Sequence, residues 1–137
     1  MITNSSLSDQ DFAGAIIERK DGKMLFQLRD NKKTTVNPNT WWIFGGGVET
    51  NETPMETVIR ELKEEINLDV NKKDLKLIHK EQLKTKKVYL YKIKFNEKTP
   101  PLKLKEGKSM RFMSKQEILK KTNVTTVLRR FLSTNYP

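Results

Sequence analysis

The 137-residue chain contains no cysteine. This absence excludes a disulfide framework and any metal site built on thiolates. The chain also lacks an apolar run of the roughly 20 residues that a membrane-spanning helix needs, and residues 1–10 are polar, without the apolar centre of a secretory signal. We therefore expect a cytoplasmic protein that has no membrane partner and that begins with a flexible segment, residues 1–10.

Acidic residues are scarce relative to basic ones. The sequence has 27 lysines and arginines against 17 aspartates and glutamates, which gives a formal net charge of +10. A basic protein attracts polyanions such as nucleotides, RNA or acidic membranes. The lysines, however, are interleaved with strand residues and build neither a basic helix nor an aromatic RNA-binding motif. We therefore expect no sequence-specific binding of nucleic acid, and we interpret the positive field as one that attracts a polyphosphate substrate.

The hydrophobic pattern predicts a single α/β domain over residues 1–137. Alternating apolar residues between turn signals predict the strands, and apolar residues at helical spacing predict the helices. We expect a mixed sheet with helices on both faces. The expected strands cover residues 12–18, 24–29, 41–44, 75–83, 88–95 and 111–113; the expected helices cover residues 54–66, a segment capped by Ser114, and an amphipathic stretch around residues 124–131.

Three residues in the expected strands have ambiguous roles. Trp41 and Trp42 are consecutive in one strand, so their side chains point to opposite faces and we expect one of them in the core. His79 is the only histidine. A lone histidine without a paired acid is more often structural than catalytic, and we interpret it so.

The expected helix over residues 54–66 carries an apolar stripe and, beside it, three carboxylates. Glu61, Glu64 and Glu65 are related by spacings of three and four, so they lie on one turn. Carboxylates this close repel one another unless a cation lies between them. Ligation by oxygen alone suits Mg²⁺ or Mn²⁺. Thr53 is the expected N-cap, followed by Pro54, and Glu56 completes a capping box.

A glycine-rich turn precedes this helix. Gly45, Gly46 and Gly47 follow an aromatic run, and glycine allows a backbone carbonyl or N–H to approach a ligand closely. Glu52 lies just before the helix, close to the carboxylates. The turn and the helix together predict one metal-dependent site.

The segment from Gly46 to Leu68 resembles the signature of the MutT-like Nudix hydrolases, the Nudix box. The match covers 23 residues at fixed spacing. It departs from the family at three positions, with Asn67 and Asn51 in place of glycine and Phe44 in place of a common proline. Asparagine is the next-best residue for a left-handed helix C-cap, so Asn67 is a mild change. The matching residues are Gly46, Glu52, Arg60, Glu61, Leu62, Glu64, Glu65 and Leu68.

The resemblance implies a Nudix α/β/α sandwich and a set of roles. Mg²⁺, which Mn²⁺ can replace, would be bound by Glu61, Glu64, Glu65 and the Gly45 carbonyl. Arg60 would orient the carboxylates, and Glu61 or the loop residue Glu106 would accept a proton. Gly46, Glu52 and Arg29 are the residues expected to contact substrate.

The implied reaction is hydrolysis of the pyrophosphate linkage in a nucleoside diphosphate joined to another group. A nucleoside triphosphate is the favoured substrate, including oxidised purine forms. Nucleotide sugars, dinucleoside polyphosphates and RNA 5′ ends remain alternatives, as does a non-catalytic Nudix-fold nucleotide-binding module. We expect a monomer or a homodimer.

Overall fold

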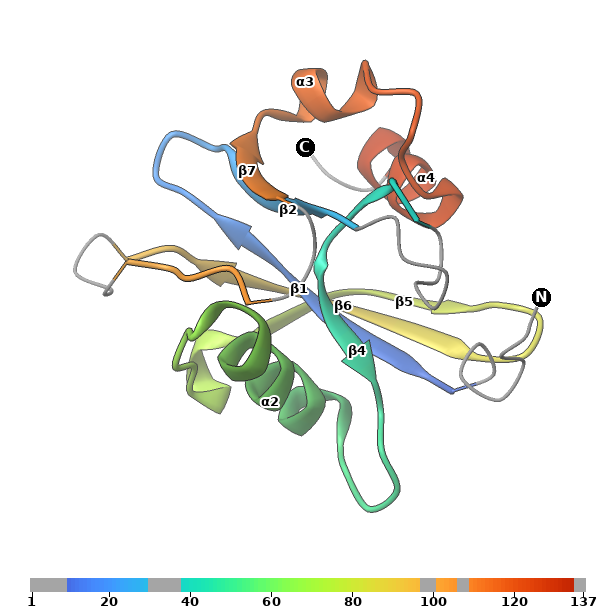
Figure 1. Ribbon diagram of the computed structural model, residues 1–137. Coiled ribbons are helices and arrows are strands. Elements are labelled where there is room, and N and C mark those ends of the chain that lie inside the picture. The colour runs from blue at the N-terminus through green and yellow to red at the C-terminus, as the bar shows by residue number, and fades with distance from the viewer. Residues whose placement is uncertain (1–9, 30–37, 97–100, 106–108, 135–137) are drawn as a thin grey trace.

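The computed structural model describes residues 10–29, 38–96, 101–105 and 109–134. The segment expected to be flexible, residues 1–10, lies outside these ranges except for Gln10, whose side-chain amide donates to the Val48 carbonyl at 3.0 Å. The strands of the described residues form one mixed sheet (Figure 1). They are β1 (Phe12–Glu18), β2 (Met24–Leu28), β3 (Trp41–Trp42), β4 (Phe44–Gly47), β5 (Lys76–Gln82), β6 (Lys87–Lys94) and β7 (Ser109–Met113).

Strand β1 is the centre of the sheet. The order is β3-β2-β1-β6-β5, with β4 paired to β1 and β7 paired to β2. Strand β6 runs parallel to β1 along its whole length, whereas β4 is antiparallel and covers only its first half. In that half Gly14 lies opposite Gly45, so the glycine turn is fixed against the middle strand of the protein.

Helices cover both faces of the sheet (Figure 1). Helix α2 (Pro54–Ile66) packs on one face, and α3 (Lys115–Leu119) and α4 (Thr126–Thr134) lie on the other. Each face has its own buried cluster, because alternate residues of β1 point to opposite sides. Ile16 belongs to the α3–α4 cluster and Ile17 to the α2 cluster. The α/β/α sandwich expected from the sequence is therefore confirmed.

The ends of α2 are set by local sequence signals. Thr53 accepts a hydrogen bond from the Glu56 backbone N–H, and the Glu56 side chain accepts from the Thr53 N–H, which completes the capping box. Asn67 ends the helix at φ 57° and ψ 38°, the left-handed conformation expected of it. A short 3₁₀ helix, η1 (Lys72–Asp74), then leads into β5. None of the helices in the described ranges has the length and apolar character needed to cross a bilayer.

Two expectations about the aromatic run need correction. Residues 41–44 form two short strands, β3 and β4, in place of one. Trp41 and Trp42 are both buried and both join the α3–α4 cluster, although we expected only one in the core. Distant segments lie against both residues: the Trp41 backbone N–H donates to the Asn123 carbonyl at 2.7 Å, just before α4, and the Trp42 ring packs on Phe12 of β1 with centroids 5.2 Å apart.

Candidate active site

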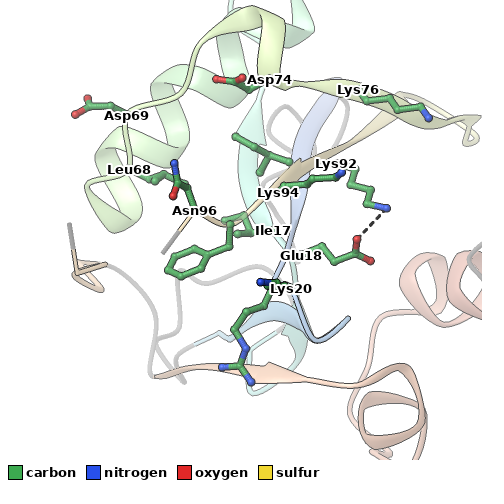
Figure 2. Close-up of a pocket in the computed structure, with 13 residues that line it drawn as sticks. Ile17, Glu18, Lys20, Leu68, Asp69, Asp74, Lys76, Lys92, Lys94 and Asn96 are labelled. Carbon is green, nitrogen blue, oxygen red and sulfur yellow. Dashed lines mark ion pairs between the residues drawn. The ribbon is translucent and has the colours of Figure 1, made fainter. Parts of the chain in front are cut away.

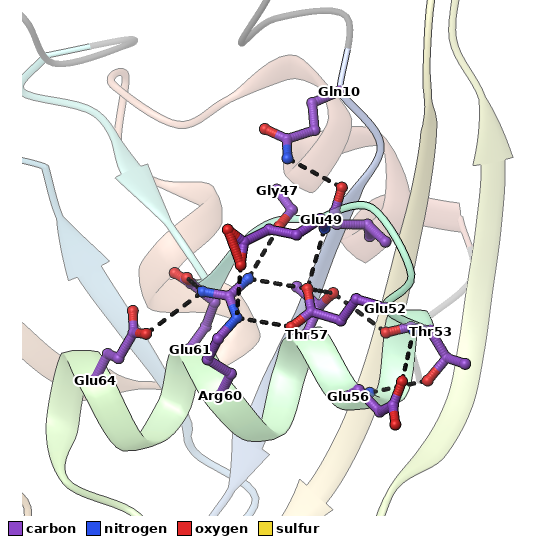
Figure 3. A network of polar contacts seen from close by, with 11 residues as sticks. Gln10, Gly47, Glu49, Glu52, Thr53, Glu56, Thr57, Arg60, Glu61 and Glu64 are labelled. Carbon is purple, nitrogen blue, oxygen red and sulfur yellow. Dashed lines mark hydrogen bonds and ion pairs between the residues drawn. The ribbon is translucent and has the colours of Figure 1, made fainter.

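Arg60 is the centre of a polar network between the glycine turn and helix α2 (Figure 3). Its Nε and Nη2 donate to the two carboxylate oxygens of Glu52 at 2.7 and 3.0 Å. Its Nη1 donates to Oε2 of Glu61 at 2.5 Å, and Nη2 also donates to the Gly47 carbonyl at 3.2 Å. A single guanidinium thus connects the loop before the helix to a carboxylate on the helix.

The carboxylate of Glu52 is held on several sides. Besides Arg60, it accepts hydrogen bonds from the Thr57 hydroxyl at 2.6 Å and from the Glu49 backbone N–H at 3.1 Å. The hydrogen bonds from Arg60 are the main reason why the pKa of Glu52 falls from its usual 4.5 to about 2. The same pairing raises the pKa of Arg60. Glu52 therefore positions Arg60, and its contact with substrate stays a prediction.

Two further carboxylates lie at the outer edge of the network. Glu49 and Glu64 approach the Arg60 guanidinium at 3.4 and 3.5 Å, and both side chains are more than half exposed. Exposed pairs of this kind contribute little stability. Arg60 contacts Glu61 as well as Glu64, and its role of orienting these carboxylates stays a prediction.

The glycine turn makes close contact with two of the helix carboxylates. The Gly45 backbone N–H donates to Oε1 of Glu65 at 3.0 Å, and Glu65 is buried. A Cβ atom on Gly46 would lie 2.4 Å from the Glu61 carboxylate, so the missing side chain is what gives this carboxylate its space. The close approach expected of the glycines is therefore made to the carboxylates of the site itself.

The donors at this site suit a hard divalent cation. Glu61, Glu64, Glu65 and the Gly45 carbonyl offer only oxygen atoms, which Mg²⁺ and Mn²⁺ prefer. In the described part of the chain, no three acidic or histidine side chains gather closely enough to hold an ion together. Glu61 and Glu64 are instead turned toward Arg60. The donor chemistry fits a metal ion, which would have to compete with Arg60 for these oxygens.

Two predicted site residues lie away from this network or beyond the described chain. Arg29 comes directly after β2, where its backbone N–H donates to the Thr40 carbonyl at 3.0 Å, and its contact with substrate stays a prediction. Glu106 lies outside the described residues. The last described residue before it, Lys105, donates its backbone N–H to the Glu65 carbonyl at 2.8 Å.

Thr57 is the network residue that sequence reasoning missed. It is fully buried, and its hydroxyl donates to Glu52 and approaches the Thr53 carbonyl at 3.2 Å. A signal was present, because Thr57 lies four residues after Thr53 and four before Glu61, which places the three on one side of the helix.

His79 is not the isolated histidine that the sequence suggested. Its Nε2 lies 2.9 Å from Oε1 of Glu81, and Glu81 also pairs with Arg130 of helix α4. The hydrogen bond from His79, and to a lesser extent that from Arg130, lowers the pKa of Glu81. The imidazole packs on Phe131 with ring centroids 4.9 Å apart. These contacts join β5 to α4 and agree with a structural role for His79.

The NUDIX domain model matches residues 10–134. An RNA pyrophosphohydrolase from Halorhodospira halophila is 40% identical over 55 residues, which make up 40% of this chain and 27% of that protein. The chain thus matches less than a third of that relative's length.

Two solved structures share the fold over nearly the whole chain. The MutT protein of Methanosarcina mazei has 24% identity and a TM-score of 0.69, with 90% of each chain covered. A MutT Nudix hydrolase from Burkholderia pseudomallei has 18% identity and a TM-score of 0.71, covering 90% of this chain and 95% of the other. At such identities the likeness shows the fold, and the domain match over most of the chain shows the family. This protein belongs to the Nudix family.

Proposed function

We propose that this protein is a Mg²⁺-dependent hydrolase that cleaves the pyrophosphate linkage of a nucleoside diphosphate joined to another group. The observation that carries the proposal is the Arg60 network. One guanidinium holds Glu61 beside the glycine turn, and Glu64 and Glu65 come within the next turn of α2. Carboxylates concentrated against a glycine turn are suited to bind a cation together with phosphate oxygens.

Each residue of the site has a proposed task. When bound, a divalent cation would neutralise charge on the diphosphate and lower the pKa of the attacking water. Arg60 keeps Glu61 in place. Glu61 or Glu106 accepts the proton of the water, and Gly46, which has no Cβ atom, leaves room for the Glu61 carboxylate beside the turn. The excess of positive charge on the protein favours the approach of a polyanionic substrate.

A nucleoside triphosphate, including oxidised purine forms, is the favoured substrate. A second candidate is the 5′-triphosphate end of RNA, because the curated relative with 40% identity is named RNA pyrophosphohydrolase. The two substrates share the same linkage, and they differ in whether an RNA chain is joined to the nucleoside. The contacts of the Arg60 network are all made within the protein, to carboxylates and backbone of the site. They therefore do not indicate whether the substrate is a free nucleotide or an RNA end.

A substrate panel tests the proposal. Purified protein with and without Mg²⁺ would be incubated with nucleoside triphosphates, an oxidised purine triphosphate, a nucleotide sugar, a dinucleoside polyphosphate and a 5′-triphosphorylated oligoribonucleotide, and the products identified by mass. We expect Mg²⁺-dependent cleavage at a pyrophosphate linkage. Binding of these compounds without turnover of any of them would instead indicate the non-catalytic binding module.

A further inference from the structure

Strand β5 lies at one end of the sheet order, where β6 is its partner among the described strands. The outer side of an edge strand presents backbone N–H and C=O groups that another strand can bind. Leu77 on this strand is 47% exposed, and within the described ranges it is the only large hydrophobic residue that is exposed. The edge and the apolar side chain together indicate a surface for association with another strand.

A bulge in β5 determines which of its side chains share a face of the sheet. The pairing with β6 shifts between Leu77 and His79. Leu77 and Lys80 lie opposite Tyr91 and Tyr89, whose rings belong to the α2 side of the sheet. These two residues of β5 therefore face the same side as helix α2.

Four other residues of β5 face helices α3 and α4. Ile78 and His79 contact the cluster or the ring of Phe131 on that side, and Glu81 pairs with Arg130 of α4. Lys76 lies opposite Lys92, which is two residues from the buried Leu90 of the same cluster. The extra residue of the bulge is what lets the consecutive Ile78 and His79 share a face. The four residues are Lys76, Ile78, His79 and Glu81.

A second copy of β5 fits this edge in one antiparallel register. Residues directly opposite each other in a sheet point to the same side, so a wrong register sets side chains of different faces against one another. All pairs match when Ile78 of one copy lies opposite His79 of the other. A shift of one or two residues in either direction places at least one pair on opposite faces. The further pairs in the matching register are Lys76 with Glu81 and Leu77 with Lys80.

This register also brings opposite charges together. Within one copy Lys76 lies opposite Lys92, and like charges in this position destabilise a sheet. Among the ion pairs of the described residues, Lys92 pairs with Glu18 at 3.0 Å and none involves Lys76; Figure 2 shows Lys76 extending away from that pair. A carboxylate has about four acceptor sites, so Glu81 of the second copy can bind Lys76 in addition to its own two partners.

On the α2 side the same register covers the exposed apolar residue. Leu77 would lie against the aliphatic stem of Lys80 from the second copy, which a lysine can bury while its ammonium stays in water. The Lys80 ammonium already lies over the Tyr89 ring, 5.5 Å from its centroid. Because a two-fold axis relates the copies, each of these contacts occurs twice.

We propose that β5 pairs with β5 of a second copy in this register and so joins the two sheets across a homodimer. Lysines on an edge strand ordinarily oppose pairing, but this register sets neither lysine of β5 against another lysine of the second β5. One short strand from each copy makes a small interface, so the dimer is weak and depends on concentration. The proposal concerns association alone, so it stands or falls separately from the proposed hydrolysis.

Sedimentation velocity over about a hundredfold range of protein concentration tests the association. Salt at about 0.15 M limits the repulsion between copies of net charge +10, because the Debye length is then about 8 Å. We expect the sedimentation coefficient to rise from that of a monomer to that of a dimer. Lys76→Glu sets two acidic residues opposite each other and should weaken the dimer at least about tenfold.

Two controls separate this contact from unfolding and from the general charge of the protein. Within one copy Lys76→Glu places opposite charges at Lys92, so urea denaturation should show no loss of stability. Lys120→Glu makes the same change in net charge at the exposed C-cap of α3, outside β5, and should change the dimer constant less than about twofold.

A disulfide tests the register, because the chain has no cysteine of its own. A mixture of Leu77→Cys and Lys80→Cys should give a linked dimer on mild oxidation, since directly opposite residues lie within disulfide distance. Leu77→Cys alone should not, because its two thiols are then offset by about 10 Å along the strands. The proposal is overturned by a monomer at every concentration, by equal losses for Lys76→Glu and Lys120→Glu, or by equal crosslinking of Leu77→Cys alone and the mixture.

Discussion

The buried Thr57 hydroxyl donates a 2.6 Å hydrogen bond to Oε1 of Glu52, the same oxygen that accepts from Nη2 of Arg60 at 3.0 Å. Hydrogen bonds to charged groups are worth about 1.5–3 kcal/mol, and a buried charge that loses its donor is costly. Thr57 therefore contributes to the position of Arg60 through Glu52, although its hydroxyl donates to neither Glu61 nor the glycine turn.

Replacing Thr57 tests this contact. Thr57→Val keeps the shape and removes the hydroxyl, so we expect a loss of about 1–3 kcal/mol in the free energy of unfolding, measured by urea denaturation. Thr57→Ser keeps the hydroxyl and should lose less. If the serine variant were as unstable as the valine variant, the methyl group and not the hydrogen bond would be responsible.

Substitution of Glu64 should reduce activity without reducing stability. Its contact with Arg60 is an exposed ion pair at 3.5 Å, so Glu64→Gln should change the free energy of unfolding by less than about 1 kcal/mol. We expect kcat to fall by orders of magnitude, because a neutral amide is a poor substitute for an anionic Mg²⁺ ligand. Glu56→Gln is the matched control, since glutamine can keep the capping box on the same helix. Wild-type turnover by Glu64→Gln on every accepted substrate would refute the metal assignment.

The lowered pKa of Glu52 predicts a specific acid sensitivity. Because this pKa is about 2 in the folded protein and 4.5 in its usual state, the pairing with Arg60 stabilises the fold above about pH 4.5. That contribution is lost progressively as the pH falls from about 4.5 toward 2. Urea midpoints of the wild type and Glu52→Gln, measured between pH 7 and pH 2.5, should converge at the acid end. A constant difference across that range would contradict the prediction.

Glu106 and Glu61 are the two candidates for the proton acceptor. We expect that the base, when changed to glutamine, loses the acidic limb of the kcat–pH profile and at least about tenfold in kcat. Glu106→Gln and Glu61→Gln would be compared across pH and Mg²⁺ concentration. If kcat, KM and the Mg²⁺ dependence of Glu106→Gln all stay within about twofold of wild type, Glu106 takes no part in the reaction.

Local signals in the sequence predicted the two ends of helix α2 better than they predicted the contacts around the candidate site. The capping box at Thr53 and the left-handed Asn67 depend on residues within one turn of the helix, and both are confirmed. The partners of Arg60 were harder to predict, because the position of Glu52 depends on the conformation of the loop before α2. In that loop Glu52 contacts both Thr57 and Arg60 of the helix.

Contacts between distant segments account for most of the remaining differences. Trp41 is covered through Asn123, a residue from the far end of the chain, and nothing near Trp41 indicates this. Glu81 is only two residues from His79 on the same strand, so that pairing was open to prediction. Its second partner, Arg130, comes from α4 and could be found only in the fold.

The two glycines of the turn should respond to substitution in different ways. A Cβ on Gly45 would lie 2.4 Å from the Ala13 carbonyl oxygen and from the Gly14 Cα, which are backbone atoms of β1. Gly45→Ala should therefore destabilise the fold by about 2–3 kcal/mol or more, since the central strand must shift.

A Cβ on Gly46 meets the Glu61 side chain instead, and the end of that side chain can rotate away. Gly46→Ala should therefore cost less stability than Gly45→Ala. It should also displace the Glu61 carboxylate, and a displacement of about 1 Å in a catalytic group can reduce turnover about 100-fold. Thermal melts and kcat of the two variants provide the measurement. Full activity in a stable Gly46→Ala variant would show that turnover does not require Glu61 to lie against the glycine turn.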